Sequence, residues 1–479
     1  MALLWPTVAR PNTKPAGPVR PVLLVLALLL AGIGYLGVGA GRQFAADRSF
    51  SPIRVPSPTA APPGVAALLS AASAPPTPSR PAPNPPAPTA TGVAAALAGP
   101  LGDPELGPSV AGQVFDARTG TLLFDRRSAD SVAPASTAKL LTAAAVLSVF
   151  APTDRFSTRV VAGAEPGTVV LVGGGDPTLS AAPAGQATRY ADAARITDLA
   201  SRVRTALHGA AVQQVLVDGS AFSGPGSAPG WGSEDTPSSY ASLITAAMVD
   251  AGRDRADADI RSAAPDLAAG NALADALGGA AVSLGSAPPD AAVLGQVHSA
   301  PVDVLVEQMM RSSDNVIAEV LARQVAIATH RPGSFAGAAE AVRAELAEAG
   351  IDIGTGMVDG SGLSVQDRIP AAALAGTLLA TLGGQHTRLR PLLSGLSIAG
   401  WDGTLLDEDR FAGPAAVAAG AVRAKTGTLT GVSGMAGLLT DADGRLLVFS
   451  FVADQAPAER PSRVAVDNLV AALVRCGCR

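Results

Sequence analysis

Hydrophobic and polar positions divide the chain into an uncharged run, a proline-rich stretch and a long region of mixed helix and strand patterns. Residues 21–40, PVLLVLALLLAGIGYLGVGA, contain no charged side chain. About twenty such residues in a helix cross the core of a bilayer. Basic residues lie before the run, so the N-terminus is expected inside the cytoplasm and the remainder outside it. The pattern predicts a cytoplasmic leader at 1–20 and a transmembrane anchor at 21–41.

A cleaved signal peptide is the alternative for this segment. Val38, Gly39 and Ala40 provide the small residues that precede such a cleavage site. The length of the apolar run favours the anchor. In both cases the bulk of the protein lies outside the cytoplasm, either as a single-pass protein of the cell membrane or as a secreted one.

Prolines concentrate after the apolar run. Residues 51–100 hold 14 of the 39 prolines, interspersed with alanine, serine and threonine. A segment of this composition buries too little apolar surface to fold and acts as a semi-extended spacer. We predict a disordered linker over 42–105.

From residue 106 onward the pattern has the periods of strands and helices. Runs of β-forming residues predict a hairpin and further strands at 111–127, 156–172, 212–218 and 422–454. Helical patterns cover 135–150, 190–209, 302–330 with a break at Ser312 and Ser313, 335–350, 370–382 and 461–475. A hairpin and helices followed by antiparallel strands and a helix indicate an α+β domain whose sheet uses both ends of the chain.

Composition excludes several kinds of partner. The net charge of −5 and the absence of a basic run argue against nucleic acid. The four histidines are scattered with no metal-binding spacing, so we expect neither a metal nor an organic cofactor. Cys476 and Cys478 lie in the last four residues, where free thiols and a labile terminal bridge are both open.

Lysine is rare in this chain. Lys14, Lys139 and Lys425 are the only lysines among 35 basic residues, so the other 32 (35 − 3) are arginines. An ammonium loses its proton near neutral pH when it is desolvated or close to another cation, whereas a guanidinium does not. Lys139 and Lys425, in the folded region, are therefore candidates for acid–base chemistry.

Three short motifs contain or separate these lysines. In Ser136-Thr137-Ala138-Lys139, the serine and the lysine lie one helical turn apart, so the amine is placed to take the hydroxyl proton of the serine. Ser313-Asp314-Asn315 and Lys425-Thr426-Gly427 follow in that order. Each motif alone is weak. Together they are the combination found in penicillin-binding proteins and class A β-lactamases, and the chemistry is acyl transfer.

The motifs assign candidate roles. Ser136 is the nucleophile, Lys139 its base, and Lys425 the cation that tunes Lys139 and holds a substrate carboxylate. Ser313 would relay protons near the leaving group, and Asn315 would bind the substrate amide. Thr426, Gly427 and Thr428 line the substrate strand, where the N–H groups of Ser136 and Thr428 are the expected oxyanion hole.

The chain resembles the class C low-molecular-mass penicillin-binding proteins, which are serine D-alanyl-D-alanine carboxypeptidases and endopeptidases. Besides the three motifs, the resemblance rests on LVGGGDPTL at 171–179, SDNVIAE at 313–319, DGSGLS at 359–364 and DGTL at 402–405. It implies a penicillin-recognising transpeptidase-like domain, with an antiparallel sheet flanked by helices. The implied substrate is a peptidoglycan stem peptide ending in D-Ala-D-Ala, and β-lactams are implied covalent inhibitors.

Motif spacing points to an insertion. Ser136 and Ser313 are 177 residues apart (313 − 136), about three times what a single-domain β-lactamase needs before its second motif. We predict a catalytic domain of residues 106–154 and 295–479, with one smaller inserted domain at 155–294. The resemblance implies two inserts in full members of the family. The interval between the first two motifs is shorter here, so we expect one insert, or one and a remnant.

The resemblance also implies an aromatic–acid–aromatic cluster that grips the free amine of diaminopimelate. Trp231, Asp235 and Tyr240 are the nearest match. One extra residue separates Trp231 from Asp235, which leaves Glu234 as an alternative to Asp235. A polar surface loop is an equally good interpretation of this stretch.

Two other functions compete with the carboxypeptidase. A β-lactamase would need a carboxylate that activates the deacylating water, and no E-x-x-x-N pattern stands at the usual distance between the second and third motifs. A catalytically silent cell-wall-binding scaffold would not need Ser136, Lys139 and Lys425 intact. The sequence leaves open whether carboxypeptidase or endopeptidase activity dominates.

Overall fold

The computed structural model describes residues 84–407 and 409–479. The predicted leader, the anchor or signal peptide at 21–41 and most of the predicted linker lie outside these residues. Within them, no helix is both long and apolar enough to cross a membrane.

A six-stranded antiparallel sheet takes strands from both ends of the described chain, in the order β10-β11-β12-β13-β1-β2. β13 pairs with β1, so the last of the described strands joins the first of them. The strands are β1 (Ser109–Asp116), β2 (Leu122–Arg126), β10 (Ser397–Ile398), β11 (Val422–Leu429), β12 (Val432–Thr440) and β13 (Leu446–Asp454). The predicted hairpin and the three predicted late strands are confirmed.

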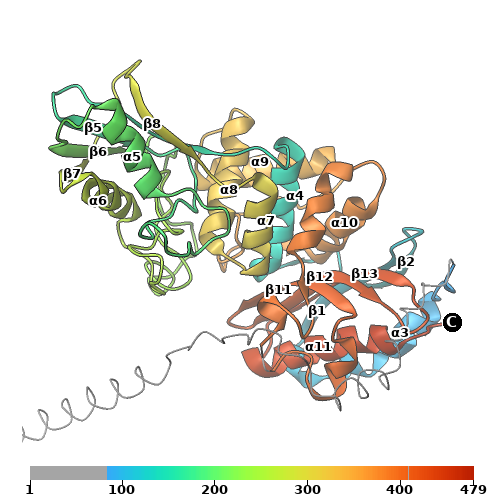
Figure 1. The fold of residues 1–479 in the computed structure, drawn as a ribbon. Helices are drawn as coiled ribbons and strands as arrows, with labels where there is room; N and C mark the ends of the chain where they lie inside the picture. The colour runs from blue at the N-terminus through green and yellow to red at the C-terminus, as the bar shows by residue number, and fades with distance from the viewer. Residues whose placement is uncertain (1–83, 408) are drawn as a thin grey trace, which may run out of the picture. The chain divides into compact units, whose positions relative to one another are not determined.

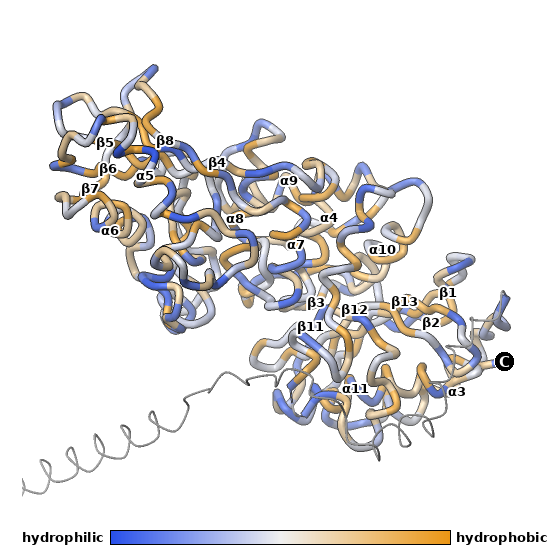
Figure 2. The backbone as a smooth tube through the Cα atoms, viewed as in Figure 1, coloured by the Kyte–Doolittle hydropathy of each residue, from blue (hydrophilic) through white to orange (hydrophobic). Residues whose placement is uncertain are grey.

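Helices cover both faces of this sheet (Figure 1). One side carries α4 (Lys139–Val149), α7 (Val302–Arg311), α8 (Asn315–Ala328), α9 (Phe335–Glu348) and α10 (Ala371–Leu382). The other side carries α3 (Ala90–Ala98) and α11 (Glu459–Arg475). Apolar residues run along β12 and β13 (Figure 2), and alternate ones face the two helical layers, because successive side chains of a strand point to opposite sides.

Short elements complete this part of the chain. β3 (Ser131–Val132) pairs with β9 (Ile369–Pro370). The 3-10 turns are η1 (Pro100–Gly102), η2 (Pro104–Leu106), η3 (Ala135–Ala138), η4 (Thr387–Gly395), η5 (Gly403–Leu405) and η6 (Gly413–Ala418).

A second sheet lies between the first and second motifs, in the order β7-β6-β5-β4-β8. Its elements are β4 (Ser157–Ala162), β5 (Thr168–Val172), α5 (Ile196–Ala206), β6 (Gln214–Asp218), α6 (Pro265–Leu277), β7 (Ala281–Leu284) and β8 (Val293–His298). These elements bury an apolar cluster of their own. β8 continues to His298, so this sheet crosses the boundary that we predicted at 294. The weak pattern of residues 250–300 gave no signal for α6, β7 or β8.

The end that we predicted for the linker, residue 105, lies beyond the start of the folded region. Residues 90–98 form α3, which buries Val93 and Leu97 against α11. The proline count of the wider window obscured this alanine-rich stretch, whose two apolar residues lie four apart on one helical face.

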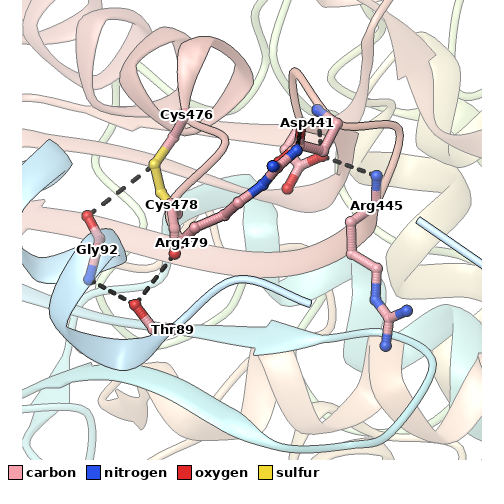
Figure 3. Close-up of a disulfide and its surroundings, with 8 residues drawn as sticks. Thr89, Gly92, Asp441, Arg445, Cys476, Cys478 and Arg479 are labelled. Atoms are coloured by element: carbon pink, nitrogen blue, oxygen red, sulfur yellow. Dashed lines mark hydrogen bonds and ion pairs between the residues drawn. A yellow bond between two sulfur atoms is a disulfide. The ribbon is translucent and has the colours of Figure 1, made fainter. Parts of the chain in front are cut away.

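The C-terminus holds the start of this helix in place. Thr89 accepts from the Gly92 N–H as the cap of α3, and its own backbone N–H and hydroxyl donate to the Cys478 carbonyl oxygen at 2.6 and 3.1 Å. Cys476 and Cys478 are joined in a disulfide beside Gly92 (Figure 3). Of the two states left open by the sequence, the structure has the bridge.

Replacing Leu97 by alanine tests whether α3 belongs to the folded unit. Leu97 has no exposed surface, so the cavity should lower the free energy of unfolding by about 2–5 kcal/mol. Urea unfolding measures the change. Leu406→Ala is the control, because Leu406 is 58% exposed and its truncation should change the free energy by about 0.5 kcal/mol or less. Equal effects at the two positions would place α3 outside the cooperative unit.

Candidate active site

Ser136 lies in a 3-10 turn that leads into α4. We predicted it on the first turn of the helix itself. Ala135, the residue before it, has a left-handed backbone with φ 46°, a conformation that costs a non-glycine residue about 1–3 kcal/mol. Lys139 is the first residue of α4, and its Nζ lies 2.8 Å from Ser136 Oγ. The predicted pairing of serine and lysine is present.

Lys139 is fully buried and its amine meets three oxygen atoms. Besides Ser136 Oγ, Nζ donates to Asn315 Oδ1 at 2.6 Å and to the Ser361 carbonyl oxygen at 2.7 Å. Burial lowers the pKa of Lys139 to about 8, although the nearby carboxylates, Asp359 first among them, act in the opposite direction. The amine is therefore able to exchange its proton near neutral pH.

The second motif occupies the junction of α7 and α8. Asp314 caps α8 by accepting from the N–H groups of Val316 and Ile317, which fixes Asn315 at the first helical position. Ser313 has a left-handed backbone, with φ 56°. This strained turn directs the Ser313 and Asn315 side chains into the same cleft as Ser136.

Asp314 is itself held by two side chains from the segment between the motifs. The Arg261 guanidinium lies 2.9 Å from Oδ2, and the Tyr190 hydroxyl donates to the same oxygen at 2.8 Å. Burial alone would raise the pKa of Asp314, but Arg261 and these hydrogen bonds hold it at about 2. Asp314 is therefore charged at neutral pH.

The third motif lies on β11, beside the serine turn. Lys425 is 1% exposed, and its Nζ donates to Ser313 Oγ and to the Thr426 carbonyl oxygen, each at 2.9 Å. Burial lowers the pKa of Lys425 well below its ordinary value, and the cation of Lys139 adds to this effect. The charge of Lys139 therefore disfavours that of Lys425, and the tuning of Lys139 by Lys425 stays a prediction.

Close packing against the serine turn explains why the third motif has glycine at position 427. A Cβ atom there would approach the Pro134 carbonyl oxygen to 2.7 Å and the Thr137 nitrogen to 3.0 Å. Only glycine lets β11 pass this close to the serine turn. β10 pairs with Arg423 and Ala424 alone, so among the described strands none covers the β11 edge at Thr426–Thr428.

Residues of all three motifs line an open cleft of about 1070 Å³. Thr426 and Thr428 form part of its wall, and Thr404 adds a hydroxyl 2.8 Å from that of Thr426. The Arg410 guanidinium also reaches the cleft and is held by two hydrogen bonds to the buried Asp467.

The predicted amine-binding cluster is only partly assembled. Asp235, Tyr240 and the alternative Glu234 line the cleft, and the Tyr240 side chain is 62% exposed. Trp231 does not line the cleft. Its indole N–H donates to Asp359 Oδ2 at 2.7 Å, and its ring packs edge-on against Phe335. Both carboxylates remain candidates for the substrate amine.

Sequence reasoning missed several residues that shape this site. Ser361 and Thr404 fall in the DGSGLS and DGTL stretches, which were noted only as family matches. Tyr190, Arg261 and Arg410 carry no local signal, because each reaches the site from a loop distant in sequence.

Comparison with known proteins identifies this arrangement. The model of the D-Ala-D-Ala carboxypeptidase 3 (S13) family matches residues 93–259 and 254–473. The chain belongs to this family. It is a serine D-Ala-D-Ala carboxypeptidase and resembles the class C low-molecular-mass penicillin-binding proteins, as its motifs indicated.

Individual relatives agree with the assignment. Carboxypeptidase Rv3627c of Mycobacterium tuberculosis is 46% identical over 438 residues, covering 89% of this chain and 91% of the relative. Carboxypeptidase DacB of Mycolicibacterium smegmatis is 42% identical over 464 residues, covering 95% and 96%. Penicillin-binding protein 4 of Haemophilus influenzae has the same fold, with a TM-score of 0.64, 21% identity, and coverage of 76% of this chain and 95% of that one.

Substituting arginine at the two buried lysines distinguishes a base from a fixed charge. Lys139→Arg should slow acylation by penicillin by about 10³-fold, because a guanidinium does not accept the serine proton. Lys425→Arg should lower the acylation rate by about 10–100-fold only, because the role of Lys425 depends mainly on its positive charge. Stopped-flow acylation of variants with native circular dichroism measures both. Wild-type acylation by Lys139→Arg would contradict the difference between the lysines.

Proposed function

We propose that Ser136 is the nucleophile of the carboxypeptidase reaction and that Lys139 is its general base. The observation that carries this assignment is the pair of contacts from one buried amine of lowered pKa to Ser136 Oγ and Asn315 Oδ1. Lys139 takes the hydroxyl proton as Oγ bonds to the carbonyl carbon of the penultimate D-Ala.

Lys425 and Ser313 complete the acyl-transfer half of the reaction. The terminal carboxylate lies along β11, against Thr426, Thr428 and the Lys425 charge. The N–H groups of Ser136 and Thr428 receive the oxyanion. As the C–N bond breaks, the proton that Lys139 took passes through Ser313, hydrogen-bonded to Lys425, to the departing D-Ala amine, which leaves Lys139 neutral and an acyl-Ser136 ester.

The second half-reaction uses the same groups. Water attacks the ester carbonyl, the neutral Lys139 takes its proton, and this proton passes to Ser136 Oγ as the ester C–O bond breaks, which restores the hydroxyl. A β-lactam enters as a mimic of the D-Ala-D-Ala end and acylates Ser136. Its leaving group stays tethered, which keeps water from the ester.

The substrate is a peptidoglycan stem peptide. Its diaminopimelate amine would lie against Asp235 or Glu234, with the exposed ring of Tyr240 on the stem, since all three line the cleft beside the motifs. Trp231 is not assigned to this contact, because it does not line the cleft and its indole N–H is bonded to Asp359.

An endopeptidase reaction on cross-linked stems is the second candidate activity. Leu429, Thr430, Glu459 and Arg463 line the same cleft, whose volume of about 1070 Å³ leaves room for a leaving group larger than D-Ala.

Intact-mass measurement after penicillin treatment tests the assignment. The wild type should gain one penicillin mass and release D-Ala from a D-Ala-D-Ala pentapeptide, and Ser136→Ala should do neither. A labelled Ser136→Ala would overturn the nucleophile. Rapid turnover of penicillin with no stable adduct would instead indicate a β-lactamase, and sacculus binding without D-Ala release a scaffold. Release of monomers from a cross-linked dimer would add the endopeptidase activity.

The catalytic region is proposed to lie outside the cytoplasm, retained at the cell membrane by residues 21–41. The support is the uncharged run in the sequence and the extracytoplasmic location of peptidoglycan. Fractionation of cells should find the full chain in the membrane and a chain lacking residues 1–41 in the cytoplasm. A mature N-terminus just after Ala40 in the medium would establish the signal peptide instead. An intact chain in the cytoplasm would refute both.

A further inference from the structure

The direction of the Lys139 lone pair depends on the other two oxygen atoms that the amine contacts. A neutral amine has two N–H donors and one lone pair. Asn315 Oδ1 and the Ser361 carbonyl oxygen are acceptors only, so they take the two N–H groups at 2.6 and 2.7 Å. The lone pair is then left for the hydroxyl proton of Ser136. Residues that fix the positions of these two acceptors therefore set the direction of the Lys139 lone pair.

The Ser361 carbonyl belongs to a loop organised by one carboxylate. Asp359 is 1% exposed and accepts four hydrogen bonds of 2.6–3.0 Å, from the N–H groups of Ser361, Gly362 and Ser364 and from the Trp231 indole. Gly362 has φ 77° and packs so closely on the serine turn that a Cβ atom would overlap the Ala135 carbonyl. The loop at residues 359–364, which brings the Ser361 carbonyl oxygen to Lys139, is therefore tightly constrained.

Trp231 reaches this loop from the segment between the first two motifs. Its ring lies edge-on to Phe335 of α9, with centroids 5.6 Å apart and planes at 73°. The Phe335 ring in turn lies beneath the Arg323 guanidinium at 4.4 Å. These contacts hold the indole N–H against Asp359, and Trp231 itself does not line the cleft.

The same segment fixes the second acceptor. Asn315 Nδ2 donates to the Tyr240 carbonyl oxygen at 3.2 Å, which turns Oδ1 toward Lys139. Tyr190 and Arg261 hold Asp314, the cap of the helix on which Asn315 lies. Both acceptors of the amine are thus tied to the polypeptide between the motifs.

We propose that the segment between the first two motifs is a positioning frame for the general base, with Trp231 acting through Asp359 and Ser361, and Tyr190 and Arg261 acting through Asp314 and Asn315. This role is separate from any contact that the segment makes with substrate. The inference rests on the proposed function in taking Lys139 as the base. Trp231 and Asp359 are positioning residues, since neither touches the reacting atoms.

Asp359 also affects the base through its charge. Among the groups around Lys139, its carboxylate opposes the effect of burial most strongly, ahead of Glu319, Asp314 and Asp367. Removing this charge lowers the Lys139 pKa further. Because acylation needs the neutral amine, its rate falls as pH drops through the Lys139 pKa, at about 8 in the wild type, and loss of the Asp359 charge moves this fall to lower pH.

Trp231→Phe tests the frame with Trp401→Phe as its matched control. Phenylalanine keeps a ring against Phe335 and removes the indole N–H, whereas Trp401 is 75% exposed. Fluorescent-penicillin acylation of the full chain is followed from pH 5.5 to 9.5, with rate constant and labelled fraction recorded separately. Trp231→Phe should acylate at least about tenfold more slowly above pH 8, with full labelling at completion, and Trp401→Phe within about twofold of wild type.

A structural role alone gives a different result. If Trp231 only stabilises the fold, the labelled fraction falls and the rate constant of the folded molecules stays at the wild-type value, which would overturn the proposal. Equal rates for the two tryptophan variants would overturn it as well. If the wild type itself shows no fall in rate near pH 8, the base assignment fails, and that failure is visible without any variant.

Two further variants separate geometry from charge. Tyr190→Phe removes a neutral donor to Asp314 and should slow acylation while leaving the midpoint of the pH profile in place. Asp359→Asn should lower the midpoint below that of the wild type. An unchanged midpoint in a folded Asp359→Asn protein would refute the electrostatic part. Wild-type rates in Tyr190→Phe would refute the positioning of Asn315 through Asp314. If the Asp359→Asn variant does not fold, Trp231→Phe alone decides whether Ser361 is positioned through Asp359.

Discussion

The buried amine of Lys139, enclosed by three oxygen atoms, is the interaction on which the rest of this structure depends. An ammonium removed from water is costly unless its donors are satisfied, and Lys139 finds acceptors in a side-chain hydroxyl, a side-chain amide and a backbone carbonyl. These come from three regions far apart in sequence. The serine turn, the start of α8 and the loop at 359–364 must therefore meet at one point, and their packing leaves little freedom to each.

The six-stranded sheet makes this meeting possible. β11 runs past the serine turn at a separation that only Gly427 permits, and it brings Lys425 to Ser313. Two buried amines then lie close together, and the charge of Lys139 lowers the pKa of Lys425. Carboxylates near Lys139 oppose the effect of its burial, so that the pKa of this lysine remains at about 8. Burial and negative charge thus act in opposite directions to keep one amine close to its point of proton exchange.

The polypeptide between the first two motifs connects to both sides of this amine. Its own five-stranded sheet and core lie apart from the chemistry, but its loops carry Tyr190, Trp231, Tyr240 and Arg261 to the rear and the rim of the cleft. This segment is hydrogen-bonded directly to Asp314 and Asn315 of the second motif. Trp231 illustrates the difference between proximity in sequence and position in space, since its neighbour Asp235 lines the cleft while its own indole faces a buried carboxylate.

The sequence alone determined the chemistry and most of the regular elements, because both are local. Ser136 and Lys139 are one turn apart in any helical backbone, and the runs of β-forming residues within 422–454, separated by turn residues, favour strands. Helix α3 and the elements of residues 265–298 were missed, because their weak patterns are stabilised by partners elsewhere in the chain. Tertiary structure alone decided that the Trp231 indole contacts Asp359 and does not line the cleft, that Ser361 and Thr404 join the site and that Cys476 bridges Cys478. Each of these depends on contacts between segments whose separation in sequence, or whose backbone conformation, no local pattern records.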